Sequence, residues 1–225
     1  MKNNANLEHV VAITSSSRGS IIAREIFMQL KIPNNTAIIY VPHIEVRETY
    51  NLLKQLNIPV KPIKNNKTIL MPGKIYISFD ETNEYKNHHD YGKWNSEIKL
   101  NEHNQYFFQH KSIKSEMLKD DPIESYYIDY VDSAFREIGK AFRKRSIGII
   151  LNGTGDGGSK GIRYLKAVGG LTIAEKIILE KGDESPKPER PETWRMPLKA
   201  IETNKIDYVL TPDEIVSKLE ELVHK

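Results

Sequence analysis

Short apolar segments alternate with stretches of helical periodicity along most of this chain. The apolar segments are rich in β-branched residues and too short for helices, which predicts buried strands. They lie at 9–14, at 36–41, at 72–79 after a turn, and at 146–151, 171–175 and 207–211. The segment SIGIIL at 146–151 is the most apolar of them.

Between these segments, apolar residues recur every three or four positions. Ile22, Ile26 and Leu30 share one face of a predicted helix at 20–30. The same spacing predicts helices at 45–56, 129–144 and about 159–168. A last helix is expected after Thr211, which suits the N-cap position, with Pro212 at the first helical position.

Strands that alternate with helices indicate an α/β fold. We expect a doubly wound, mostly parallel sheet with helices on both faces, in three α/β/α layers. The chain is expected to form one domain over 1–225. A polar excursion at 80–127 is expected to carry a hairpin near 98–109, and 180–192 is expected to be an exposed loop.

The composition narrows the function class. Hydrophobic residues make up 39% and charged residues 28%, and the net charge is only +3. This balance does not indicate a nucleic-acid partner or an anionic membrane surface. The chain has no cysteine, which excludes disulfides and thiolate chemistry. The N-terminus lacks the apolar core of a signal peptide, and no run approaches the roughly 20 apolar residues of a membrane span. We therefore expect a cytoplasmic protein without membrane insertion.

Candidate chemistry lies where strands end, because ligands of open α/β sheets bind beyond the carboxyl ends of the strands. Ser15, Ser16 and Ser17 follow the first strand, His43 follows the second, and Asp156 lies in the loop after 146–151. A serine, a histidine and an acid are the components of a nucleophilic triad. Each also has a simpler interpretation, as a helix cap, a polar residue at a strand end or a turn residue.

The glycine-rich loop permits a second interpretation. Gly153, Gly155 and Gly158 have the spacing of a dinucleotide fingerprint, and Glu175 ends the next strand at the distance of a ribose-binding acid. Such fingerprints usually open the first strand–helix turn of the fold, whereas this one lies late in the chain. Nucleotide binding through 153–158 therefore stays a lesser alternative.

Several histidines lie in the polar stretch, at 88, 89, 103 and 110. Their spacing is not that of a metal site, and histidines in so polar a segment are usually solvated. We expect no metal and no cofactor.

Eight short motifs follow one another along the chain: SSRG, the PHIEV that contains His43, PGKIYIS, VDSAF, LNGTGDGG, GGLTIAE, RMPLKA and IDYVL. This series resembles the catalytic domain of the chemotaxis protein-glutamate methylesterases (CheB-type). That family has S-T-G-G, H-M-P, P-G-x-V-Y-I-A, D-x-L-F, L-T-G-M-G-x-D-G, G-G-x-T-I-A, M-P-x-x-A and V-D-x-V-L in the same order. GxSxG, the α/β-hydrolase signature, is absent. The similarity covers nearly the whole chain, and we expect a stand-alone domain without the N-terminal receiver domain of chemotaxis methylesterases.

The resemblance implies roles for particular residues. Ser16 falls on the nucleophile and His43 on the base, while Ser17, Thr154 and Gly155 fall on positions that support the oxyanion. The family's aspartate aligns with Gly157, so the acid here, Asp156, is one position early.

The implied activity is a protein-glutamate methylesterase or glutamine deamidase. Its expected partner is a methylated receptor or another protein substrate, and a separate regulatory protein is a further candidate partner. The displaced acid leaves a second hypothesis open, a catalytically impaired binding module on the same fold.

Overall fold

A computed structural model describes residues 7–16, 19–43, 46–55, 57–63, 67–78, 94–112, 130–178 and 191–223. The strands are β1 (His9–Ser15), β2 (Thr36–Pro42), β3 (Val60–Ile63), β4 (Thr68–Ile69), β5 (Lys74–Ser78), β6 (Trp94–Leu100), β7 (Tyr106–Ser112), β8 (Ser146–Ile150), β9 (Leu171–Glu175) and β10 (Tyr208–Leu210). The helices are α1 (Gly19–Gln29), α2 (Val46–Gln55), α3 (Tyr130–Phe142), α4 (Ser159–Ala167), α5 (Pro191–Glu202) and α6 (Pro212–Val223), and the 3-10 turn η3 (Arg143–Arg145) joins α3 to β8.

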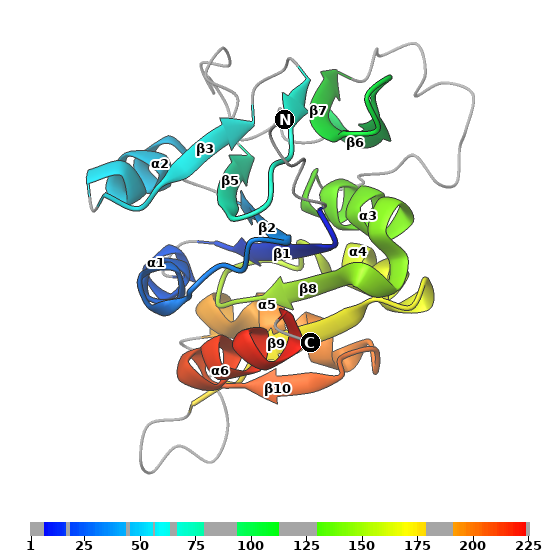
Figure 1. Cartoon of the computed structure of the whole chain (residues 1–225). Coiled ribbons are helices and arrows are strands. Elements are labelled where there is room, and N and C mark those ends of the chain that lie inside the picture. Colours follow the sequence, from blue (N-terminus) through cyan, green and yellow to red (C-terminus); the bar gives the residue numbers. More distant parts are fainter. Residues whose placement is uncertain are drawn as a thin grey trace.

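Seven strands form one sheet in the order β10-β9-β8-β1-β2-β5-β3, and every neighbouring pair is parallel (Figure 1). From β1 the chain moves toward β2 on one side, and it returns as β8 on the other. The junction of β1 and β8 is therefore the topological switch point, where open α/β sheets bind their ligands.

Helices cover both faces of this sheet, as the sequence predicts. Val10 and Ala12 of β1 pack in one hydrophobic cluster with α3, α4 and α5. Val11 and Ile13 of the same strand pack in a second cluster with α1, α2 and α6. Because successive side chains of a strand point to opposite faces, the continuous apolar run of β1 serves both clusters. The predicted three-layer α/β/α architecture is confirmed.

A small antiparallel sheet of β4, β7 and β6 packs beside α3 (Figure 1). The pairing of β6 with β7 confirms the hairpin predicted near 98–109. The rest of the predicted excursion, at 80–93 and 113–127, lies outside the described residues. Most of the predicted loop at 180–192 also lies outside them, and its last two residues begin α5.

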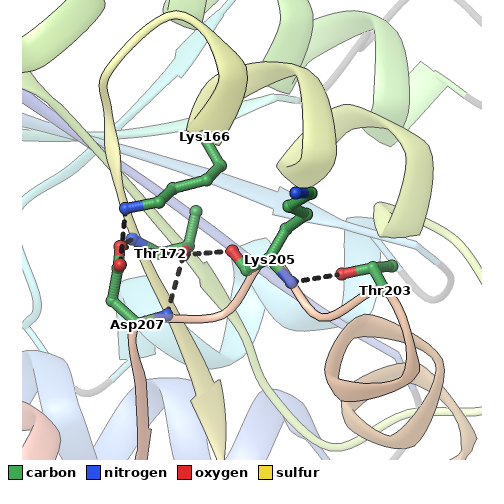
Figure 2. A network of polar contacts seen from close by, with 5 residues as sticks. All are labelled: Lys166, Thr172, Thr203, Lys205 and Asp207. Carbon is green, nitrogen blue, oxygen red and sulfur yellow. Dashed lines mark hydrogen bonds and ion pairs between the residues drawn. The ribbon is translucent and has the colours of Figure 1, made fainter.

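The amino ends of β9 and β10 are joined by a polar network (Figure 2). The Thr172 N–H donates to Asp207 Oδ2 at 2.9 Å, and the Asp207 N–H donates back to Thr172 Oγ1 at 3.1 Å. Lys166 of α4 forms an ion pair with the same carboxylate. The Thr172 hydroxyl also donates to the carbonyl of Lys205 at 2.6 Å. This network fixes β10 to β9 at the edge away from the candidate site.

The last helix begins as the sequence predicts. The Thr211 N–H donates to Glu214 Oε2 at 2.8 Å, and the Glu214 N–H donates to Thr211 Oγ1 at 3.4 Å. This reciprocal pair is a capping box.

Candidate active site

The loops that carry the candidate residues follow β8, β1 and β2, which are adjacent strands of the parallel sheet. Backbone hydrogen bonds join these loops. The His43 N–H donates to the carbonyl of Ser15 at 2.7 Å, and the Ser16 N–H donates to the carbonyl of Asn152 at 3.1 Å. The backbone of Ser15 and Ser16 is thus hydrogen-bonded to the loops on both sides of it.

Ser16 is the first residue after β1 and is 1% exposed. Its Oγ lies 3.4 Å from Thr154 Oγ1, and either hydroxyl can donate. Its carbonyl accepts the N–H of Gly19, which opens α1. Ser15, one position earlier, turns into the core and pairs with the Tyr40 hydroxyl at 2.6 Å. Of these two neighbouring serines, Ser16 is therefore the one that contacts the glycine loop; Ser17 lies outside the described residues.

The glycine loop passes close to both Ser16 and His43. A Cβ on Gly153 would lie 2.4 Å from Met196 Sδ and 2.7 Å from Ser16 Cβ, so this position has no room for a side chain. Gly155 has a φ of +85°, and a Cβ there would lie 3.9 Å from His43 Cε1. The structure therefore places Ser16 beside Gly153 and Thr154, and His43 beside Gly155 of the same loop.

An aromatic ring lies beside His43. Tyr130, the first residue of α3, stacks parallel to the imidazole, with 6.3 Å between the ring centroids and 9° between the planes. This distance is within the range of offset stacking. Tyr130 could not be predicted from the sequence, because no local pattern shows which residue of a distant helix stacks on the histidine.

Asp156 is exposed, and its carbonyl accepts the Ser159 N–H at 3.2 Å. Its carboxylate has no hydrogen bond or ion pair with another of the described residues. Its neighbours Gly155 and Gly158 both have positive φ angles. The structure thus places Asp156 in the loop expected for the acid without bringing its carboxylate to His43.

Two buried carboxylates hold the ends of the glycine loop. Asp132 of α3 accepts the Gly161 N–H at 2.6 Å, just after the loop. Glu175, at the end of β9, accepts the Asn152 N–H at 2.7 Å, at the start of the loop. Glu175 is 2% exposed, and burial raises its pKa to about 7 although the Asn152 N–H partly offsets this shift. Its partner here is backbone, which is not the ribose-binding arrangement of the dinucleotide interpretation.

The family assignment rests on comparisons with known proteins. The model of the CheB methylesterase family matches residues 11–219. The chain belongs to the CheB methylesterase family. The crystal structure of the catalytic domain of the Thermotoga maritima CheB methylesterase has the same fold, with a TM-score of 0.64 and 23% identity over 95% of this chain and 98% of that one.

Curated relatives carry names of the same family. A probable protein-glutamate methylesterase from Borreliella burgdorferi is 27% identical over 95% of this chain and 49% of its own length. A protein-glutamate methylesterase/protein-glutamine glutaminase from Rhodospirillum rubrum is 40% identical over 26% of this chain and 15% of its own length. The chain thus spans about half, or less, of the length of these curated relatives.

Within the described residues, no three histidine, cysteine, aspartate or glutamate side chains come together as a metal site would require. His103 is exposed beside Glu102, whereas residues 88 and 89 lie outside the described part. None of the described helices has the length and apolar character of a membrane span.

Proposed function

We propose that this chain is a serine hydrolase that demethylates glutamyl methyl esters, and deamidates glutamines, on a chemoreceptor-type protein. The observation that carries the proposal is the 3.4 Å contact of Ser16 Oγ with Thr154 Oγ1. This contact lies at the carboxyl ends of the central strands, where the His43 N–H donates to the Ser15 carbonyl. The names of the relatives support the substrate class, because they are methylesterases and glutaminases of protein glutamate and glutamine. The proposed setting is the cytoplasm.

In the first half of the reaction, Ser16 Oγ attacks the ester carbonyl carbon and His43 takes the hydroxyl proton. The backbone N–H groups of Thr154 and Gly155 are proposed to stabilise the oxyanion, and Ser17 is proposed to support them. The tetrahedral intermediate then collapses. The bond to the methoxy group breaks, and His43 returns the proton to give methanol and a glutamyl-enzyme ester.

In the second half, His43 takes a proton from water, and the resulting hydroxide attacks the glutamyl-enzyme carbonyl. Collapse of the second intermediate releases glutamate and returns the proton to Ser16. A glutamine substrate follows the same route, with ammonia as the leaving group. These steps use the groups of this chain and water.

Asp156 is proposed to orient His43 and to stabilise the imidazolium. Its side chain is exposed and does not reach His43, so this role requires the loop to rearrange when substrate binds. Glycines at 155, 157 and 158 lower the conformational cost of such a rearrangement. Catalytic contacts that form only in the substrate complex are common in hydrolases.

The test uses a methylated receptor-type protein as substrate, with methanol release as the measurement. In parallel, a fluorophosphonate probe reports an activated serine. The wild-type chain is expected to release methanol and to be labelled, whereas Ser16→Ala should lose both signals. The matched control is Ser15→Ala, because Ser15 is as buried as Ser16 but pairs with Tyr40 and not with the glycine loop. The Ser15→Ala variant should still be labelled by the probe at Ser16.

The exposure of Asp156 favours one competing function, a binding module that has lost catalysis. A wild-type chain that releases no methanol and resists the probe, yet binds the methylated protein as tightly as Ser16→Ala does, would establish that alternative. Binding of a dinucleotide in a calorimetric titration would instead support the interpretation of 153–158 as a nucleotide site.

A further inference from the structure

Glu175 is a buried acid that the proposed reaction does not use. It is the last residue of β9, which is the neighbour of β8 in the sheet. Its exposed fraction is 2%, and no ion pair reaches it from the described residues. A buried carboxylate without a cationic partner destabilises the fold, so its presence calls for a physical reason.

We propose that Glu175 is a positioning residue for the Ser16 nucleophile, acting through the backbone of Asn152; the inference rests on the proposed function. Glu175 Oε2 accepts the Asn152 N–H at 2.7 Å. The carbonyl of the same Asn152 accepts the Ser16 N–H at 3.1 Å. One peptide segment therefore joins the acid to the serine by two successive hydrogen bonds.

The space around Asn152 leaves this segment little freedom to shift. The carbonyl oxygen of Asn152 packs on Gly19, where a Cβ would lie only 1.9 Å away. The next carbonyl, that of Gly153, accepts the N–H of Met196 from α5 at 3.1 Å. A displacement of Asn152 would thus move the start of α1, the attachment of α5 and the backbone of Ser16 together.

The sheet itself does not supply this hydrogen bond. The ladder of β8 with β9 ends at Ile150 opposite Ala174, so the Asn152 N–H lies beyond the last pair. The Lys176 N–H, on the far side of Glu175, donates to Leu210 of β10. A side chain must therefore reach back to accept the Asn152 N–H. In addition, the Asn152 Oδ1 is buried, and none of the described residues donates a hydrogen bond to it, which is an energetic cost at this position.

The charged groups near this end of β9 lie in solvent. Lys176 follows Glu175 in the chain, and the first turns of the packed helices carry Lys160 on α4 and Asp213 and Glu214 on α6, while Arg195 lies on α5. All five side chains are exposed. The high pKa of Glu175, about 7, follows from burial, opposed only by the bond from Asn152. Titration of Glu175 can therefore be followed separately from these neighbours.

The test compares Glu175→Ala, Glu175→Gln and Glu214→Gln, with the methylated receptor-type protein as substrate. Glu175→Ala removes the acceptor and should lower kcat tenfold or more, with KM changed less than threefold, since misplaced groups cost about 10²-fold. Glu175→Gln keeps a carbonyl acceptor and should retain kcat within about threefold at pH 7. Glu214→Gln is the control at an exposed position.

Amide hydrogen exchange of Asn152 and Ser16 supplies a readout without turnover. Faster exchange of both amides in Glu175→Ala, but not in Glu175→Gln, is the expected result. Wild-type kcat and exchange in Glu175→Ala would overturn the inference, and so would an equal loss of kcat in the alanine and glutamine variants. If the wild-type chain itself releases no methanol, the proposed function fails, and the exchange rates still decide whether Glu175 holds the Ser16 backbone.

Discussion

An acidic side chain lies at each end of strand β9, and the surroundings of the two shift their pKa values in opposite directions. At the amino end, Asp207 binds the N–H and hydroxyl of Thr172 and pairs with Lys166 (Figure 2). Burial acts against its charge, but the hydrogen bonds and the charge of Lys166 outweigh it, so the pKa of Asp207 lies below its ordinary value. At the carboxyl end, burial dominates and raises the pKa of Glu175 to about 7.

The opposite pKa shifts distinguish Asp207, which stabilises the fold, from Glu175, which we propose positions the nucleophile. The network of Asp207 joins two strands and a helix, and all its contacts favour the ionised carboxylate. Glu175 makes a contact that a neutral amide could also make, in a place where its charge is costly. Acids kept in such surroundings cluster at functional sites, which agrees with the place of Glu175 beside the glycine loop.

The largest expected effect is on the pH dependence of stability in Glu175→Gln. Because folding raises the pKa of Glu175 from 4.5 to about 7, its favourable contribution is complete below pH 4.5 and is lost as the pH rises through 7. Relative to Glu175→Gln, the wild-type chain should lose up to about 3 kcal/mol of unfolding free energy between pH 4.5 and 8. Urea unfolding at a series of pH values measures this, and parallel curves for the two proteins would contradict it.

A smaller effect is expected for Asp207→Ala. This change removes the acceptor of the Thr172 N–H and the partner of Lys166, at a site partly open to solvent, and should cost about 1 kcal/mol. Because folding lowers the pKa of Asp207, its contribution is present above the ordinary value of 3.8 and is lost only as the pH falls through the lower folded value. The cost should therefore be constant from pH 5 to 8 in the same unfolding experiments. A cost that grows or shrinks across that range would remove the contrast with Glu175.

The smallest effect is expected for Lys166→Gln. The ion pair with Asp207 is partly exposed, so its loss should cost about 0.5 kcal/mol or less at low salt. Screening should abolish the difference in 1 M NaCl, which unfolding curves at two salt concentrations can check. Asp207→Ala should keep most of its cost at high salt, since its hydrogen bonds to Thr172 do not depend on the charge of Lys166.

Much of the fold could be predicted because its signals are local. The β-branched runs of β1, β2 and β8 and the spacing of the flanking helices place the central strands within a residue or two. The sequence analysis did not predict the short strands β3 and β4, because so few residues show too little periodicity. In addition, β3 contains Pro62, which is unfavourable in a strand. Helix α5 also escaped, because Pro197 lies inside it and a proline there usually ends a helix.

The sequence predicts only those site residues whose positions follow from the ends of strands. Ser16 and His43 follow β1 and β2 directly, so the parallel sheet brings their loops together. The position of Asp156 depends on the positive φ angles around it, which no spacing rule reveals. The hydrogen-bond partner of Glu175 depends on where the β8–β9 ladder ends, which the sequence does not show. The glycine spacing therefore suggested that Glu175 contacts a ribose, whereas in the structure it accepts the Asn152 N–H.

The contact between Ser16 and Thr154 has a consequence for folding. The two residues are 138 positions apart, and the chain between them includes β2, β5 and β8. Contacts of such separation form only after the entropy of closing a long loop has been overcome, and they slow folding. The pair can assemble only once β8 has docked on β1. Labelling of Ser16 during refolding would therefore report the arrival of the late half of the sheet, not the formation of its first strands.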